Sequence, residues 1–200
     1  VERRNWLIED WVPYQRELAL VGSRDINGGI KVLPLAETHQ LDQVCDWVLA
    51  PAEVSQSVEA MAYNIVASLL TELNYVGVIA IEFFYGERGL MVNEVAPRTH
   101  NSAHFSIEAC VSSQFDQQIC IAAGIPTPEP TLLVPGALMV NLLGLPESFP
   151  LSINQRLSKL KSLEGVYLHW YEKKQEIPGR KMGHVTLLLK NNDSSLRRNE

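Results

Sequence analysis

Two kinds of hydrophobic periodicity run along the chain, and they predict strands on either side of a long helix. Short apolar runs closed by turn residues predict strands at 7–12, 17–24, 30–35, 76–85 and 90–95. Between them, apolar side chains recur every three or four residues, which predicts a helix from its N-cap Ser55 to Leu73. We expect its buried stripe to consist of Val58, Met61, Ala62, Ile65, Leu69 and Leu73.

A second predicted helix is followed by a proline-rich segment and then by short apolar runs. The helix is predicted over 102–123, where Gly124 and Pro126 end it. Four prolines between positions 126 and 135 predict a linker. Short apolar runs return at 137–143, 166–171 and 184–189. We therefore expect an α+β fold with residues 1–125 as an antiparallel sheet with flanking helices, 131–190 as a small, mostly β C-terminal domain, and 191–200 as a polar tail.

The composition is that of an ordinary globular protein, and its charge narrows the class of partner. The formal charge of −6 and the pI near 5.4 argue against a general binder of nucleic acids or anionic membranes, which needs a dominant positive field. Cys45, Cys110 and Cys120 show no metal-ligand spacing, which is typical of a reducing cytoplasm. Because the chain starts directly in apolar-rich sequence without Met, we expect an N-terminal portion to precede Val1.

One predicted hairpin places two carboxylates opposite each other. If the loop is the three residues 87–89, Gly86 faces Leu90, and counting outward puts Glu82 opposite Glu94 with their Cβ atoms about 5 Å apart. The opposite, core face is then expected to hold Ile79, Ile81, Phe83, Met91 and Val95.

Such a carboxylate pair repels unless something lies between the two groups. A hard divalent cation would satisfy both, because Mg²⁺ accepts one or two carboxylates and completes its coordination with phosphate oxygens and water. The alternative is a solvent-facing strand surface with an Arg or Lys nearby. Asn93, by alternation, falls on the apolar face, so a ligand role for it requires a bulge or the end of the strand.

The loop after this strand is crowded with polar groups. Pro97 ends the strand, and Arg98, His100, Asn101 and Ser102 follow at the start of the predicted helix. Main-chain N–H groups at a helix N-terminus favour an anion, and Arg adds a planar fork for carboxylate or phosphate. The alternative is an Asn or Ser cap with an exposed Arg and His.

A basic cluster stands out in this acidic chain. Lys173, Lys174, Arg180 and Lys181 flank a Pro-Gly turn between two predicted strands, which brings the two pairs together. A phosphate-bearing ligand suits such a cluster. The alternative is the solvated tip of a hairpin.

These motifs resemble one family. The segments IEDWVPYQRELALV, IEFF, NEVAPRTHNSAHFSIEAC, HWYEKK and PGRKMGH are similar to those of 5-(carboxyamino)imidazole ribonucleotide synthase, the ATPase subunit of phosphoribosylaminoimidazole carboxylase, in the ATP-grasp superfamily. The resemblance covers residues 5–189 and implies the C-terminal lobe of an ATP-grasp fold. It departs from the family at Thr99, Ala103 and Ile177, and the last replaces an Arg that often contacts the substrate phosphate.

The resemblance implies an ATP- and bicarbonate-dependent carboxylation of 5-aminoimidazole ribonucleotide through carboxyphosphate, in purine biosynthesis. It implies ATP and Mg²⁺ (or Mn²⁺) as cofactors, small-molecule substrates and a homodimer. The first lobe of an ATP-grasp enzyme supplies Lys residues and a Gly-rich loop that this chain lacks, so we expect the chain to be an inactive portion of the enzyme. The alternatives are another ATP-grasp ligase, or a non-catalytic nucleotide-binding or dimerisation module.

The resemblance also assigns roles to individual residues. The hinge strand that receives adenine corresponds to Glu9, Asp10, Trp11 and Val12, while Glu17 would hold the ribose and His39 would lie near the nucleotide. The metal carboxylates correspond to Glu82 and Glu94, with Asn93 beside them, and Arg98 and His100 would act on bicarbonate and carboxyphosphate. The remaining substrate contacts would come from Asn101, Ser102, Lys173, Arg180 and Lys181.

Overall fold

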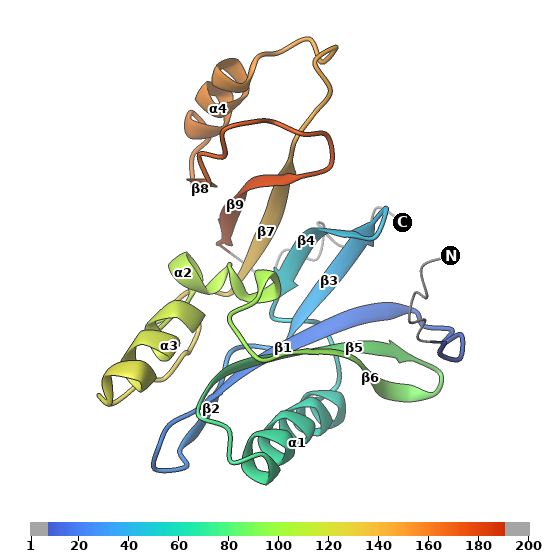
Figure 1. Cartoon of the computed structure of the whole chain (residues 1–200), viewed down its shortest axis with the longest axis vertical. Coiled ribbons are helices and arrows are strands. Elements are labelled where there is room, and N and C mark those ends of the chain that lie inside the picture. Colours follow the sequence, from blue (N-terminus) through green and yellow to red (C-terminus); the bar gives the residue numbers. More distant parts are fainter. Residues whose placement is uncertain (1–7, 191–200) are drawn as a thin grey trace, which may run out of the picture.

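The computed structural model describes residues 8–190, which fold around one continuous antiparallel sheet (Figure 1). The strands are β1 (Arg16–Arg24), β2 (Ile30–Val32), β3 (Ala36–Leu41), β4 (Val44–Ala50), β5 (Gly77–Gly86), β6 (Gly89–Ala96), β7 (Gly136–Leu143), β8 (Val166–Trp170) and β9 (Lys181–Leu189). The helices are α1 (Gln56–Glu72), the 3₁₀-helix η1 (Asn101–Ala103), α2 (Ser106–Ala109), α3 (Gln114–Ala123) and α4 (Ile153–Lys161). The sheet order is β6-β5-β1-β3-β4-β7-β9-β8, with β2 paired to β1.

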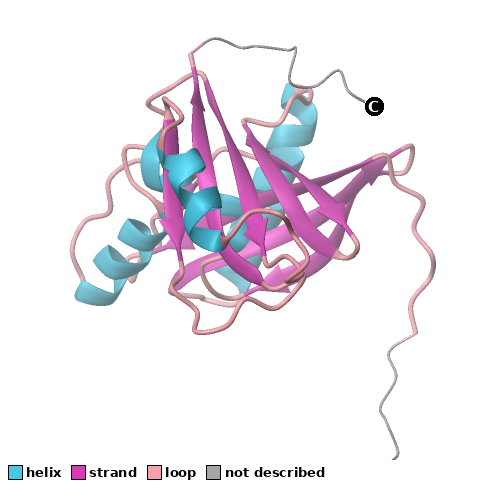
Figure 2. Ribbon diagram, turned by 90° about the horizontal axis from the view of Figure 1, so that it is seen from above, coloured by secondary structure: helices cyan, strands magenta, loops and turns pink. Residues whose placement is uncertain are grey.

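Helices lie on both faces of this sheet (Figure 2). On one face, Leu18, Ile79 and Phe83 pack with the buried side of α1. On the other face, Val21, Ala80 and their neighbours pack with η1 and α2, including the fully buried Phe105. None of the helices within residues 8–190 has the length and apolar character required to cross a bilayer.

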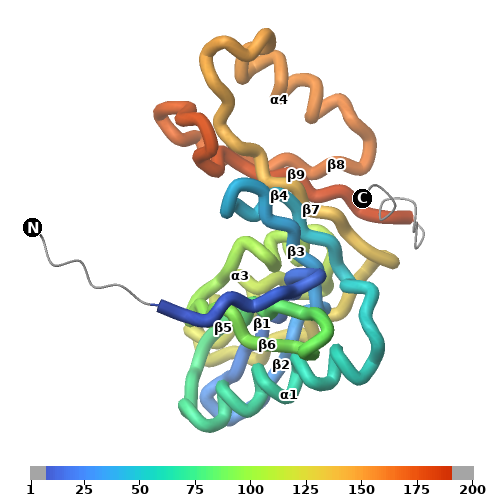
Figure 3. Tube along the Cα trace, turned by 90° about the vertical axis from the view of Figure 1, so that its right-hand side faces the viewer, coloured from blue at the N-terminus to red at the C-terminus, as the bar shows by residue number. Residues whose placement is uncertain are grey.

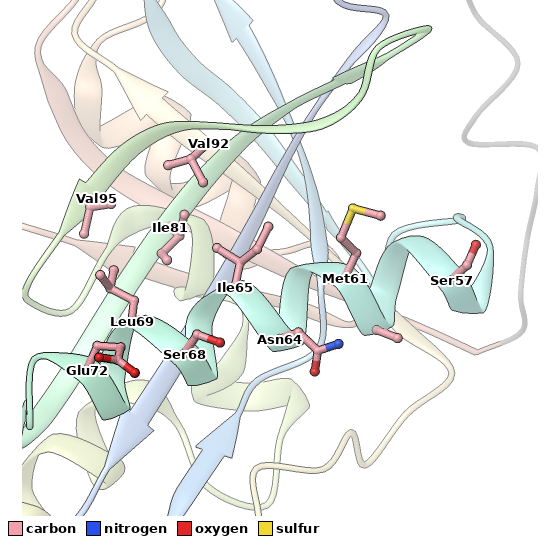
Figure 4. Close-up of a pocket in the computed structure, with 11 residues that line it drawn as sticks. Ser57, Met61, Asn64, Ile65, Ser68, Leu69, Glu72, Ile81, Val92 and Val95 are labelled. Atoms are coloured by element: carbon pink, nitrogen blue, oxygen red, sulfur yellow. The ribbon is translucent and has the colours of Figure 1, made fainter.

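The buried stripe of α1 differs from the predicted one. The helix buries Val58, Ala62, Val66 and Leu70 against the sheet. Met61 and Leu73, which we expected to be buried, are 48% and 61% exposed. The burial face is rotated because the flank with Met61, Ile65 and Leu69 lies beside β6, the edge strand, where it borders an open apolar groove with Val92 and Val95 (Figure 4).

The prediction of strands was correct in the centre of the sheet and incomplete elsewhere. Strands β1, β2, β5 and β6 lie where periodicity placed them. The strand predicted at 7–12 is wrong for the described residues 8–12, which have no regular structure, and Leu7 lies outside the described residues. The hairpin β3–β4 was missed; its turn residues Asp42 and Gln43 both have positive φ, as a type I′ turn requires.

The single helix predicted over 102–123 is divided into η1, α2 and α3. The interruption occurs because Cys110 bridges to Leu132 and the chain then restarts with a new cap. Ser113 accepts a hydrogen bond from the main-chain N–H of Asp116, whose carboxylate accepts one from the N–H of Ser113. This reciprocal capping box starts α3, which ends, as predicted, at Gly124.

The C-terminal strands extend the same sheet. β7 pairs with β4, with Val48 opposite Met139, so hydrogen bonding continues from the first part of the chain into the second. The three predicted strands are present as β7, β9 and β8, and Figure 3 shows them at the end of the molecule away from α1. Helix α4 was not predicted, although Ser152 and Gln155 form a capping box that marks its start. The limits of two domains remain a prediction, and the proposed tail at 191–200 lies outside the described residues.

We predict that Ser113→Ala will lower the free energy of unfolding by about 1 kcal/mol, because the N-terminus of α3 loses the acceptor for the N–H of Asp116. Urea unfolding followed by circular dichroism measures the change. The matched control is Ser55→Ala, since Ser55 occupies the N-cap of α1 but its side chain accepts no capping hydrogen bond and bonds Ser57 instead. Equal losses in the two variants would contradict this account of α3.

Candidate active site

An open cleft of about 580 Å³ lies where β5 and β6 meet the β3–β4 hairpin, the loop after β6 and the start of β9. It brings together many of the residues singled out in the sequence: Glu17, Glu82, Asn93, His100, Asn101, Ser102 and Lys181. Residues far apart in the chain therefore share one cleft because the antiparallel sheet places their strand ends side by side.

The predicted carboxylate pair is present, although the loop that was expected to set it is not. Glu82 lies opposite Glu94, as predicted. The loop has two residues instead of three, since Gly86 pairs with Gly89, and a bulge between Glu82 and Phe83 restores the register. The extra residue of this bulge is Asn93, which consequently lines the cleft beside Glu82. The shorter loop shifts the register of β6 by one residue and the bulge shifts it back, so Glu82 still lies opposite Glu94.

The same bulge changes the face of the residues before it. Met91, which we expected in the core, lies opposite Phe84, a residue of the cleft. Val92 takes the opposite face, across from Phe83, but is 48% exposed. Val95 shares that face and is 41% exposed, so neither Met91 nor Val95 is a core residue. Because β6 is the edge strand of the sheet, it has a neighbouring strand on one side only, which leaves these side chains partly exposed.

Glu82 experiences an unfavourable field. Burial raises the pKa of its carboxyl group, and the charges of Glu94 and Glu17 raise it further, while Lys181 and Arg98 oppose them. Within residues 8–190, the only His, Lys or Arg side chain within 4 Å of the Glu82 carboxylate is that of His100, whose Nε2 lies 3.7 Å from Oε1. The alternative of a carboxylate neutralised by a neighbouring Lys or Arg is therefore not what the geometry provides.

His100 holds a defined orientation against Glu82. Its Nδ1 accepts from the main-chain N–H of Ser102 at 3.4 Å and lies 3.0 Å from the Ser102 hydroxyl. The neutral ring therefore carries its proton on Nε2, which faces Glu82. Burial lowers the pKa of His100, and the charge of Arg98 lowers it further, which favours this neutral form.

The expected anion site at a helix N-terminus is not formed in this loop. The predicted helix start at Ser102 is the three-residue η1, too short to carry a helix dipole. Arg98 is exposed, lies outside the cleft lining, and donates to the carbonyl of Thr99 in its own loop. Its charge still reaches the cleft, because it lowers the pKa values of both Glu82 and His100.

The residues assigned to the nucleotide are divided. Glu17 lines the cleft and accepts a hydrogen bond from the Tyr14 hydroxyl at 2.7 Å. His39 lies outside the lining, stacked on Trp47 with ring centroids 5.2 Å apart, and its neighbour Gln40 faces the cleft instead. The expected hinge residues form no strand in this structure and lie outside the lining, with Trp11 87% exposed and Glu9 and Asp10 also exposed, while Val12 is half-buried.

The basic cluster is only partly gathered. Lys181 lines the cleft. Lys173 donates to the main-chain carbonyl of Lys181, and its amine lies 5.6 Å from the ring centroid of Tyr171. Arg180 is exposed outside the lining. The segment between them is anchored by Glu176, whose two carboxylate oxygens both accept from Nη2 of Arg156 in α4.

Sequence reasoning missed several cleft residues. Tyr14 stacks on Phe84 with centroids 4.3 Å apart and lies within a segment whose acids alone had attracted attention. Gln40, Gln43 and Cys45 come from the β3–β4 hairpin, which was not predicted. Burial raises the pKa of Cys45 to about 11, so its thiol stays neutral and is not a nucleophile.

The donor set suits a cation that is shared with a ligand. Among residues 8–190, no group of three or more His, Cys, Asp or Glu side chains is placed to hold a metal ion unaided. Glu82 and Glu94 supply two carboxylates, and Mg²⁺ normally takes one or two and leaves its other positions to phosphate and water. The raised pKa of Glu82 is the electrostatic strain that such a cation relieves.

Comparison with known proteins assigns both parts of the chain. A family model described as the ATP-grasp domain matches residues 1–115, and one described as the phosphoribosylaminoimidazole carboxylase C-terminal domain matches residues 137–198. The chain is 45% identical over 193 residues to an N5-carboxyaminoimidazole ribonucleotide synthase of Synechocystis sp., an alignment that covers 92% of this chain and 50% of the relative. The corresponding Bacillus subtilis protein is 36% identical over 198 residues, or 96% of this chain and 49% of the relative.

Solved structures agree. The N5-carboxyaminoimidazole ribonucleotide synthetase of Thermus thermophilus has a TM-score of 0.81 at 34% identity, covering 90% of this chain and 48% of that one. The Aspergillus clavatus synthase in complex with ADP and 5-aminoimidazole ribonucleotide has a TM-score of 0.82 at 30% identity, covering 90% and 48%. The chain thus spans about half the length of these relatives. The matches confirm the predicted resemblance and the α+β fold class.

We predict that Glu82→Gln will stabilise the chain at pH 7 to 8 when neither cation nor nucleotide is present. The folded state holds the Glu82 proton more tightly than the unfolded state does, so stability is lost as pH rises from the ordinary value of 4.5 through the raised pKa. The amide does not ionise and avoids that loss, so the gain should vanish toward pH 4.5. Thermal melts across this range measure it.

The control is Glu87→Gln in the exposed turn of the same hairpin, which should change stability little at any pH. A Glu82→Gln variant that is less stable than the unmodified chain at pH 8 would show that the carboxylate is not under repulsion.

Proposed function

The chain belongs to the ATP-grasp family, and from this premise we propose that it takes part in ATP- and bicarbonate-dependent carboxylation of 5-aminoimidazole ribonucleotide to 5-(carboxyamino)imidazole ribonucleotide. It would do so together with residues equivalent to the other half of its relatives. The observation that carries the proposal is the cleft itself, where Glu82 meets His100 and Lys181, with the exposed Glu94 paired opposite Glu82 just outside the cleft lining. The match of residues 137–198 to the carboxylase C-terminal domain favours this ligase over other ATP-grasp ligases.

The carboxylates would receive the nucleotide. Glu82 and Glu94, with Asn93 beside them, would hold Mg²⁺ (or Mn²⁺) bound to the phosphates of ATP. When bound, the cation offsets phosphate charge as bonds to phosphorus change. Glu17 would bind the ribose hydroxyls, the main chain from Glu9 to Val12 would receive adenine, and His39 would lie nearby.

The loop after β6 would handle the carboxyl group. An oxygen of bicarbonate attacks the γ-phosphorus of ATP, ADP leaves, and carboxyphosphate forms. The exocyclic amine of the ribotide then attacks the carboxyphosphate carbon, which releases phosphate, and the amine loses a proton. Arg98 and His100 would orient and stabilise these anions, so the protein contributes positioning and charge more than covalent chemistry.

The ribotide would lie along the start of β9. Lys181 would meet the anionic substrate from within the cleft, and Lys173 and Arg180 would bind its phosphate from the adjoining segment. Asn101 and Ser102 would complete the contacts from η1. The Nδ2 of Asn101 is buried beside the thiol of Cys45, a weak acceptor, and has no oxygen or nitrogen acceptor within residues 8–190, which supports a ligand acceptor at this position. We also propose that the protein is cytoplasmic and forms a homodimer.

We predict that the chain alone binds Mg·ATP weakly and does not turn it over. The chain spans about half the length of its relatives, and the proposed function requires residues equivalent to their other half. Isothermal titration with Mg·ATP and a phosphate-release assay with bicarbonate and aminoimidazole ribonucleotide test this, with the Synechocystis relative as positive control. Ribotide-dependent ATP hydrolysis by these residues alone would refute it.

We predict that Glu94→Gln will lower kcat by about 100-fold or more in a chimaera that joins the N-terminal half of the Synechocystis relative to this chain. Removing one carboxylate leaves the nucleotide phosphates with a poorly held cation. The measurement is ribotide-dependent ADP release, and Glu87→Gln is the control on the same hairpin. Near-normal turnover of the Glu94→Gln variant would remove Glu94 from the site. Stimulation of the unmodified chimaera by a different substrate would indicate another ATP-grasp ligase. Nucleotide binding by that chimaera without any turnover would indicate a non-catalytic module.

A further inference from the structure

A buried amide outside the cleft grips the main chain of a cleft residue. Gln114, the first residue of α3, is 0% exposed. Its Oε1 accepts from the main-chain N–H of His100 at 2.7 Å, and its Nε2 donates to the main-chain carbonyl of His100 at 2.7 Å. One side chain thus satisfies both polar main-chain groups of His100.

The orientation of this amide is determined by its partners. A flipped Gln114 would aim its NH₂ group at the N–H of His100 and its oxygen at the carbonyl, which pairs donor with donor and acceptor with acceptor. The second proton of Nε2 reaches Nδ1 of His104 at 3.0 Å, so that nitrogen accepts. Burial lowers the pKa of His104 to about 4, which keeps the acceptor available.

The grip is transmitted to the imidazole of His100. With its main chain fixed in an extended conformation at φ −134 and ψ 153, the ring reaches Ser102 through Nδ1 and faces Glu82 through Nε2. A small rotation of the His100 main chain would change both contacts, because the side chain leaves from that main chain.

Gln114 is itself held rigidly. Its main-chain N–H donates to the Ser106 hydroxyl at 3.1 Å, and that hydroxyl donates to the Ala103 carbonyl at 2.6 Å. The capping box of Ser113 and Asp116 fixes the first turn of α3 around it. The support for His100 is therefore built from η1, α2 and α3 together.

We propose that Gln114 is a positioning residue that sets the orientation of His100 beside Glu82 through two hydrogen bonds to the His100 main chain. Its effect on catalysis rests on the function proposed above, whereas its effect on the imidazole does not. Gln114 touches neither substrate nor cofactor in that proposal; it acts only through His100.

The chain offers a matched control one turn further along α3. Gln117 is 2% exposed, and its amide also makes three hydrogen bonds: from the Ser23 hydroxyl, to the Ser112 hydroxyl, and to the carbonyl of Pro128. None of these partners lines the cleft. Gln114→Met and Gln117→Met each remove a buried amide of similar volume, so we expect comparable losses of thermal stability, and only the first should disturb His100.

The first measurement is made on this chain by long-range ¹H–¹⁵N NMR of its histidine side chains. We expect the unmodified chain and Gln117→Met to show His100 as the single Nε2–H tautomer, and Gln114→Met to show shifted nitrogen signals from a mixture of tautomers. Unchanged His100 signals in Gln114→Met, or equal changes in both variants, would overturn the proposal.

A second variant decides the matter if Gln114→Met does not fold. Gln114→Glu keeps the size and the acceptor for the His100 N–H but loses the donor to the His100 carbonyl and to His104. The same shift of the His100 signals is expected, and its absence would again overturn the proposal. Because His104 faces His100, Lys181, His169 and His184, the spectra are compared at one pH, near 7.5, where its ring is neutral.

The catalytic consequence is measured in the Synechocystis chimaera. We expect Gln114→Met to lower kcat about 10-fold or more, with the KM for ATP little changed, and Gln117→Met to stay within about 2-fold of the unmodified chimaera. Equal kcat in the two variants would overturn the catalytic part. An unmodified chimaera without ribotide-dependent turnover would count against the proposed function, and the NMR comparison would still decide the role of Gln114.

Discussion

The half-buried carboxylate of Glu82, set opposite Glu94, is the constraint on which the site depends. Burial is the largest cause of its raised pKa, and the charges of Glu94 and Glu17 raise that pKa further, so this arrangement of acids costs the folded chain stability. Positive charge from Lys181 and Arg98 offsets it only in part, since the net shift remains upward. Glu82 thus remains a half-buried carboxylate at a cost in stability, and the cation proposed for this site would relieve that cost.

The sheet can bear that cost because its two halves form one hydrogen-bonded surface. Pairing of β4 with β7 joins the part that holds the acids to the part that holds Lys181. A second connection lies beside the cleft, where the His184 ring of β9 lies 4.9 Å from the tilted ring of His104 and stacks on His169 at 4.5 Å, both between centroids, and His169 contacts Glu108 of α2. Burial lowers the pKa of His184 to about 3 and that of His104 to about 4, so these two rings are neutral near pH 7 and pack without mutual repulsion.

What the sequence predicted well was what local periodicity determines. Counting outward from an assumed three-residue loop gave the Glu82–Glu94 pair, which is present because the bulge at Asn93 compensates for the shorter loop, and the three-four spacing gave the existence of α1. Periodicity did not give the rotation of α1, because Met61 and Leu73 are as apolar as the residues that are buried and only the edge position of β6 leaves them uncovered. Alternation predicted only that Asn93 would need a bulge in order to share the face of Glu82, and the observed pairing of β5 with β6 contains that bulge. Side-chain capping signals at Ser113 and Ser152 were present in the sequence and would have corrected the helix limits.

The family motifs emphasise residues with a visible chemical role, some of which lie in the cleft, and the residues that hold them in place are less conspicuous. His100 belongs to a motif with a visible chemical purpose, whereas Gln114 reads as an ordinary polar residue of a helix. Because Gln114 is fully buried, its amide must be hydrogen-bonded within the protein, and it makes two hydrogen bonds to the His100 main chain and one to the His104 ring. A Gln side chain ends in one acceptor oxygen and one NH₂ donor group. It can therefore fix a main-chain conformation by hydrogen bonding, which no apolar side chain of the same volume can do. The orientation of His100 is therefore set by one buried amide as well as by the charges around it.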